Sequence, residues 1–255
     1  MLLGQPERTP YDLNFVLLGV PVRVHPFFWL VALMLSGLGQ PIMVFIWVVA
    51  IFISILAHEM GHALAARAHG WQPWITLYGL GGLASYQPTR RDPWSQIVIS
   101  LAGPVAGFLL AGFIVSALFA AGHSVSFQFG SPLGIDLQVD GIDNDRLFYF
   151  VKNMLWINIA WGLVNLLPIF PLDGGQVSRE LFNLYYPRDG VRTSLRLSMF
   201  VAAAVCVYGL SLSRQFSGRQ QGLFIAILFG YLAYSSYAAL QAYSGRGGGF
   251  RGGGW

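Results

Sequence analysis

Long apolar stretches separated by short polar breaks dominate the chain. Six of them can cross, or nearly cross, a lipid bilayer, and they lie roughly at 26–38, 42–66, 94–121, 147–167, 197–212 and 223–243. The first is the shortest, and the turn-forming residues of 37–41 end it. The pattern predicts an all-α multi-pass membrane protein with about six transmembrane helices.

One segment, 71–93, follows a different pattern. Its β-type residues at 75–86 surround a glycine-rich turn at 79–82, which predicts a short, membrane-associated β-hairpin. Strand edges exposed to lipid are not tolerated, so a hairpin that enters the bilayer must line a protein cavity. A hydrophobic loop at the membrane surface is the alternative interpretation.

Composition and charge agree with a membrane location. The chain is 55% hydrophobic and 10% charged, whereas an ordinary soluble domain is about 25% charged. A cytoplasmic N-terminus places eleven arginines inside and leaves Arg146, Arg214 and Arg219 outside, which follows the positive-inside rule. We expect an integral protein of a bacterial-type cytoplasmic membrane, in contact with its lipid. The net charge of +4 forms no basic tract, so no nucleic-acid partner is expected.

The chain is expected to contain one domain. Residues 1–243 form the transmembrane core in this interpretation, and the Gly/Arg-rich segment 244–255 is a disordered tail. The N-terminal residues lack the basic and apolar regions of a cleavable signal peptide. Cys206 is the only cysteine, which excludes an internal disulfide and a cysteine-based metal site.

The second apolar stretch contains the motif His58-Glu59-x-x-His62, nearer its cytoplasmic end. On a helix the two histidines project from one face, and in this motif they bind one Zn²⁺ ion. Glu59 is placed to act as a base toward a water on that metal, so it is the candidate catalytic residue. The fifteen residues before His58 carry no charge, and a carboxylate in such a span is costly and usually functional.

A catalytic zinc site requires a third protein ligand. The candidates are His25, His69, His123 and Asp173. Asp173 follows the fourth apolar stretch on the cytoplasmic side, level with the two histidines, whereas His123 falls on the opposite side. His69 lies about two helical turns beyond His62, and His25 precedes the first stretch.

The residues around Asp173 favour it as the third ligand. Pro168 and Pro171 break the preceding helix, while Gly174 and Gly175 allow a sharp turn and a close approach of the backbone. Irregular backbone at membrane depth must lie inside protein or face a water-filled cavity. The alternative is that Asp173 caps a helix that begins near Gly174.

Two asparagines, Asn158 and Asn165, lie on one face of the fourth stretch. Polar side chains in a span either hydrogen-bond a neighbouring helix or, at an active site, orient a substrate carbonyl. Both interpretations remain open for Asn165, and the helix contact is favoured for Asn158.

Together these residues resemble the site-2 protease family of intramembrane zinc metalloproteases. The resemblance extends from about residue 20 to residue 243. It rests on two elements, His58-Glu59-x-x-His62 and Asn165-x-x-Pro-x-x-Pro-x-Asp173-Gly-Gly. The sequence Ser-Leu-Ala-Gly-Pro at 100–104 and the sequence Arg-Val-His-Pro at 23–26 support it.

The resemblance implies a role for each residue. His58, His62 and Asp173 match the zinc ligands of the family, Glu59 matches its catalytic glutamate, and Asn165 matches an asparagine that holds substrate or stabilises the oxyanion. The predicted hairpin lies where the family carries a membrane-embedded one, and it can pair with an extended substrate by strand addition. Neither a PDZ-like insertion nor a C-terminal regulatory domain is visible, so a minimal form is expected.

The expected function is hydrolysis of peptide bonds in transmembrane segments of membrane-protein substrates, as in regulated intramembrane proteolysis. One alternative is a zinc protease with a downstream glutamate ligand, for which Glu180, in a polar cytoplasmic loop, is the only candidate. The other is a non-proteolytic membrane protein that binds or transports metal. Glu59 argues against it, because metal carriage needs no base beside the histidines.

Overall fold

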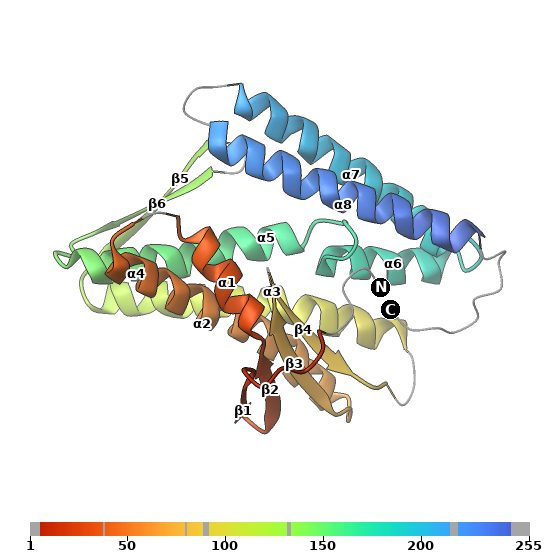
Figure 1. Ribbon diagram of the computed structural model, residues 1–255, viewed down its shortest axis with the longest axis horizontal. Coiled ribbons are helices and arrows are strands. Elements are labelled where there is room, and N and C mark those ends of the chain that lie inside the picture. Colours follow the sequence, from red (N-terminus) through yellow and green to blue (C-terminus); the bar gives the residue numbers. More distant parts are fainter. Residues whose placement is uncertain are drawn as a thin grey trace. The chain divides into compact units, whose positions relative to one another are not determined.

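The computed structural model describes residues 6–37, 39–79, 81–88, 92–131, 134–214 and 219–245, without the side chains of 127–137 and 245 (Figure 1). Contacts between Cα atoms divide the chain into two compact units. One contains residues 5–91 and 101–164, and the other contains mainly residues 92–100 and 165–255.

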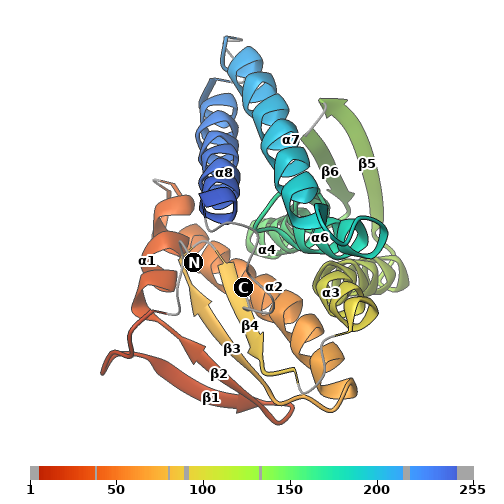
Figure 2. The same ribbon diagram turned by 90° about the vertical axis from the view of Figure 1, so that its right-hand side faces the viewer.

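The first unit contains a four-stranded sheet formed by β1 (Leu13–Leu17), β2 (Val20–Val24), β3 (Pro73–Tyr78) and β4 (Gly81–Tyr86), in that order (Figure 2). β1–β2 and β3–β4 are antiparallel hairpins, and β2 pairs with β3 in parallel. The predicted hairpin at 75–86 is thereby confirmed, with Gly79 at a φ of 60° in its turn. Strands β1 and β2 lie before the first apolar stretch and were not predicted.

The sheet packs against the helices of the same unit through its apolar face. Val20, Val22 and Val24 of β2 share a buried cluster with Ile75 and Leu77 of β3, because alternate residues of a strand point to the same side. This cluster includes residues of two helices, α1 (Pro26–Leu35) and α2 (Pro41–Ala68). The sheet therefore fixes the position of α2, which carries the His58-Glu59-x-x-His62 motif.

The remaining elements of this unit lie further along the chain. They are the part of α3 (Pro93–Ala120) after Ser100, β5 (Ser124–Ser131), β6 (Gly134–Asp140), α4 (Asp145–Trp156), the π-helix η1 (Ile157–Trp161) and most of α5 (Gly162–Asn165). β5 and β6 pair as an antiparallel hairpin between the third and fourth apolar stretches.

A buried hydrogen bond joins the π-helix to α2. The side-chain amide of Asn158 donates to Ser54 Oγ and to the Met154 carbonyl, each at 2.8 Å. A π-turn inserts one extra residue per turn and so re-aims the side chains beside it. The bond confirms that Asn158 contacts a neighbouring helix.

The second unit contains α6 (Asp173–Tyr185), α7 (Gly190–Ser213) and α8 (Arg219–Gly245). α7 and α8 lie side by side in both ribbon views (Figures 1 and 2). Their backbones approach closely at two glycines: a Cβ on Gly209 would lie 2.7 Å from the amide nitrogen of Ala226, and one on Gly222 would overlap Ser213. Small residues allow this packing in membrane helices.

In the described part of the chain, five helical segments are long and apolar enough to cross a membrane: Pro41–Ala68, Pro93–Ala120, Asp145–Asn165, Gly190–Ser213 and Arg219–Ser244. They correspond to the second to sixth predicted stretches, and the chain is a multi-pass integral membrane protein. The first stretch forms only the ten-residue helix α1. At 1.5 Å per residue it is about 15 Å long, half of the hydrocarbon thickness. The expected tail at 244–255 lies almost entirely outside the described residues.

Candidate metal centre

The two histidines of α2 lie side by side on one helix face. His58 and His62 are both buried, with 8% and 7% of their surface exposed. Their Nε2 atoms are 3.2 Å apart, and the ring planes meet at 82°. The i, i+4 spacing therefore brings one nitrogen of each ring to the same point, as the sequence predicted.

The histidine pair fits a tetrahedral zinc ion. Zinc–nitrogen bonds of about 2.0–2.1 Å at a tetrahedral angle place two ligand nitrogens about 3.3 Å apart. The observed 3.2 Å between the Nε2 atoms is close to that separation. Each imidazole must then be neutral with Nε2 unprotonated, because the lone pair of that nitrogen forms the bond to the metal.

Asp173 begins helix α6. The helix thus starts one residue before Gly174, and its N-cap residue, Leu172, makes no capping hydrogen bond through its side chain. A Cβ on Gly174 would overlap the Leu166 carbonyl, and one on Gly175 would overlap the Ile169 carbonyl. The prediction that these glycines allow a sharp turn and a close backbone approach is confirmed.

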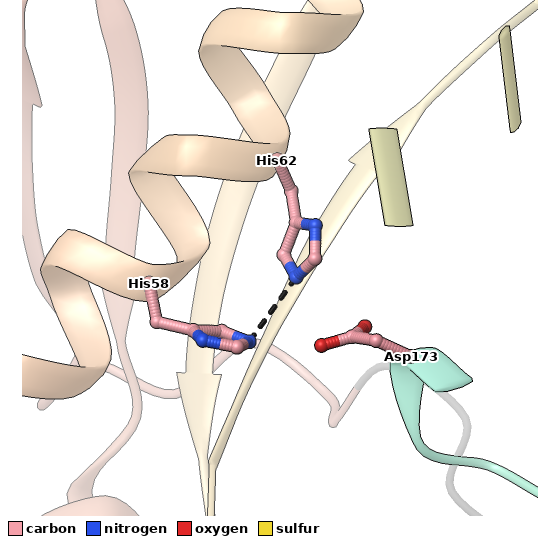
Figure 3. Close-up of side chains that lie close together, drawn as sticks. All are labelled: His58, His62 and Asp173. Atoms are coloured by element: carbon pink, nitrogen blue, oxygen red, sulfur yellow. Dashed lines mark hydrogen bonds between the residues drawn. The ribbon is translucent and has the colours of Figure 1, made fainter. Parts of the chain in front are cut away.

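Figure 3 draws the side chains of the three candidate ligands, His58 and His62 on α2 of the first unit and Asp173 at the start of α6 of the second. Two nitrogens and a carboxylate oxygen are ligands that zinc takes in catalytic sites.

The other histidines have structural contacts elsewhere. His25 is the N-cap of α1, where its Nδ1 accepts a hydrogen bond from the Phe27 amide at 3.1 Å. His69 ends α2, and its Nδ1 lies 2.8 Å from the Ala65 carbonyl oxygen. His123 lies against Gly141 before the β5–β6 hairpin.

Glu59 lies in contact with the edge of the sheet. Its side chain is buried, with 6% of the residue exposed. Carboxylate oxygen Oε2 accepts a hydrogen bond of 2.8 Å from the backbone amide of Ala84 in β4. A charged hydrogen bond of this kind offsets part of the cost of placing a carboxylate inside a membrane span.

Two other predicted residues take positions that sequence reasoning did not fully describe. Asn165 is buried at the end of α5, with 7% of its surface exposed. Glu180 was expected in a polar loop, but it lies in helix α6. It is 7% exposed and accepts two hydrogen bonds from Arg179. The chain continues as a helix there because Gly175 to Tyr185 contains no further breaker.

Gly103 of α3 was noticed only as part of a familiar motif, yet it contacts both histidines. A Cβ at this position would overlap the His62 ring and lie 2.8 Å from Nε2 of His58. One turn of α2 beyond the first histidine, a Cβ on Gly61 would overlap the Ala102 carbonyl. Helix α3 therefore packs closely against α2 beside the two histidines, at Gly61 and at Gly103.

Gly103→Ala is expected to weaken zinc binding by about 10–100-fold. A loss of this size is typical when a residue that holds a metal ligand in position is replaced. The added methyl pushes the His62 ring out of line with His58. Zinc content and affinity of the purified protein, measured with a competing chelator, test this.

Gly112→Ala is the matched control, because it makes the same change in the same helix and its Cβ meets no atom within 4 Å. Equal zinc affinity in the two variants would contradict the expectation.

The fold and this site define a class of protein: a multi-pass membrane protein with a His-Glu-x-x-His metal site on a spanning helix. The chain belongs to peptidase family M50, because the model of that family matches residues 46–208, more than half of its length. The expected resemblance to site-2 proteases is thereby confirmed.

Individual relatives are similar to this chain over most of its length. A zinc metalloprotease of Methanocaldococcus jannaschii is 26% identical over 77% of this chain and 53% of its own length. Stage IV sporulation protein FB of Bacillus subtilis is 27% identical over 70% of this chain and 54% of its own. The chain spans about half the length of the curated relatives it matches.

A solved structure shares the fold. The site-2 protease from Methanocaldococcus jannaschii matches with a TM-score of 0.54 and 22% identity, over 88% of this chain and 95% of that one.

Proposed function

We propose that this chain is a zinc metalloprotease that hydrolyses peptide bonds in transmembrane segments of membrane proteins. The observation that carries the proposal is the burial of His58, Glu59 and His62 in a helix of membrane length, with the two histidine Nε2 atoms 3.2 Å apart. Membership of peptidase family M50 supports the reaction class.

The proposed zinc ligands are His58, His62 and Asp173. A zinc ion bound there supplies a Lewis acid and lowers the pKa of its water to about 7. Glu59, one residue from the first ligand, accepts the proton from the attacking water and later donates it to the leaving amine. Asn165 is proposed to hold the substrate backbone or to stabilise the oxyanion through its side-chain amide.

The membrane setting of the site selects the class of substrate. A peptide bond within a helix has its carbonyl oxygen hydrogen-bonded and shielded by side chains, so the substrate segment must unwind locally before attack. We propose transmembrane proteins as substrates, in a bacterial-type cytoplasmic membrane. The N-terminus is proposed to be cytoplasmic, with the active site nearer that side, because the arginines favour that orientation.

The test uses the purified full chain in lipid vesicles with a single-span peptide whose span contains Gly and Pro. Cleavage within the span is expected with zinc, is lost after treatment with a chelator, and returns when zinc is added. Mass spectrometry of the products locates the cut. A protein that retains zinc, leaves a panel of such peptides intact and moves zinc across the vesicle membrane would be a metal transporter, and the proposal would fail.

A further inference from the structure

We propose that strand β4 positions the carboxylate of Glu59, through the amide of Ala84 and the space left by Gly82. The inference rests on the proposed role of Glu59 as proton acceptor and adds the element that holds this side chain in place. Ala84 and Gly82 are positioning residues in this proposal, since they contact Glu59 and not the substrate.

The register of the hairpin explains why the Ala84 amide points toward Glu59. Tyr78 pairs with Gly81 across a two-residue turn, so these residues form the closing hydrogen-bonded pair. In an antiparallel ladder such pairs alternate with non-bonded pairs, whose amides point away from the partner strand. Ala84, opposite Ile75, falls in a non-bonded pair.

The position of β4 in the sheet leaves this amide for Glu59. β4 is the last strand in the order β1-β2-β3-β4, so its outer edge pairs with no further strand of this sheet. Glu59 lies at that edge and accepts the Ala84 hydrogen bond at 2.8 Å. The bond is charge-assisted and is made in a buried setting, where such bonds are strong.

Gly82 provides the second contact. A Cβ on Gly82 would overlap Glu59 Cγ and lie 2.6 Å from Cδ and 2.8 Å from Oε1. The carboxylate side chain therefore packs directly over the Cα of Gly82, and no other residue type leaves this space. Two residues of one strand, 82 and 84, thus fix both the side-chain path and one oxygen of Glu59.

A general base must lie within about 2.6–3.2 Å of the proton it accepts, and a displacement of about 1 Å can reduce the rate 100-fold. Gly82→Ala is therefore expected to lower kcat about 100-fold on the single-span peptide, with KM and zinc content unchanged. The two zinc-binding histidines point elsewhere and keep their positions, so the loss is confined to the proton-transfer step.

Gly81→Ala is the matched control. It adds the same methyl to the neighbouring residue of the same strand, where a Cβ meets no atom within 4 Å. Gly81 also faces β3 in its hydrogen-bonded pair with Tyr78 and not the outer edge. We expect wild-type kcat for this variant. A Gly82→Ala protein with wild-type kcat, or equal losses in both variants, would overturn the proposal.

A second measurement needs neither zinc nor substrate. In zinc-free protein labelled with ¹⁵N-alanine, the Ala84 amide signal is assigned from its disappearance in Ala84→Ser. A charged hydrogen bond moves the amide proton downfield and slows its exchange with solvent. Glu59→Ala is expected to reverse both effects at Ala84, and an unchanged signal would overturn the proposal.

The two proposals fail in different experiments. Retained cleavage in Glu59→Gln would remove the catalytic role of Glu59, whereas single-span peptides left intact by the zinc-loaded wild type would remove the proposed function. An unchanged Ala84 signal in Glu59→Ala, or wild-type kcat in Gly82→Ala, would remove only the positioning role of β4.

Discussion

Glu59→Gln is expected to retain zinc and to lower the rate of cleavage by about 10²–10⁴-fold, the range that general acid–base catalysis contributes. Glutamine has nearly the size of glutamate, and its side-chain oxygen can still accept the hydrogen bond from Ala84. The side chain therefore keeps its place against β4 while it loses the ability to take up a proton. This substitution therefore tests proton uptake by residue 59 separately from the position of its side chain.

Two measurements make this result specific. Zinc content by mass spectrometry is expected to match the wild type, and the Ala84 amide is expected to remain hydrogen-bonded with a smaller downfield shift, because its acceptor is now uncharged. Glu180→Gln is the matched control, since it makes the same change at a second buried glutamate whose partner is Arg179. Cleavage that survives in Glu59→Gln would show that another group accepts the proton.

Asp173→Ala is expected to remove stable zinc binding altogether. A catalytic zinc site has three protein ligands, and loss of one leaves only His58 and His62. The zinc affinity should fall by more than about 10–100-fold, which is the loss when a residue that hydrogen-bonds a metal ligand is replaced. Cleavage is lost with the metal and returns only partly at high zinc concentration.

Glu180→Ala separates this result from the alternative of a downstream glutamate ligand. Asp173 and Glu180 both belong to α6, and replacement by alanine removes the carboxylate in each case. We expect Glu180→Ala to bind zinc as the wild type does, because its carboxylate is bonded to Arg179 at 2.7 Å. Zinc loss in Glu180→Ala and its retention in Asp173→Ala would reverse the assignment.

The local parts of the site could be predicted from the sequence. Four residues make just over one helical turn, so the spacing of His58 and His62 alone places both rings on one face. The prolines before Asp173 restrict the backbone, and the glycines after it allow a sharp turn. Both effects are local and could be predicted. The apolar stretches predicted the membrane-spanning helices, because a helix needs about 20 apolar residues to cross a bilayer.

The contacts that hold the site could not be predicted in this way. Gly103 and Gly82 belong to other elements than Glu59, His58 and His62, and their role depends on the distance between backbones. A glycine that leaves room for a neighbour has the same local pattern as a glycine in open space, such as Gly112. The doublet Gly81-Gly82 was the available signal, and it was read only as part of a turn.

Strands β1 and β2 were missed for a related reason. Each strand has only five residues, and Pro21 within β2 argues against a strand, so the alternation of Val20, Val22 and Val24 is too short to be decisive. The pairing that stabilises β2 comes from β3, about fifty residues further along the chain. Such long-range pairing leaves no trace in the local sequence.

The parallel pairing of β2 with β3 has a consequence for the order in which the protein is built. Parallel strands need a crossover between them, and here the crossover consists of α1 and α2. During synthesis, β3 can therefore join β2 only after both helices have been made. The hairpin that brings Ala84 to Glu59 thus completes its sheet only after α2, which carries Glu59, already exists.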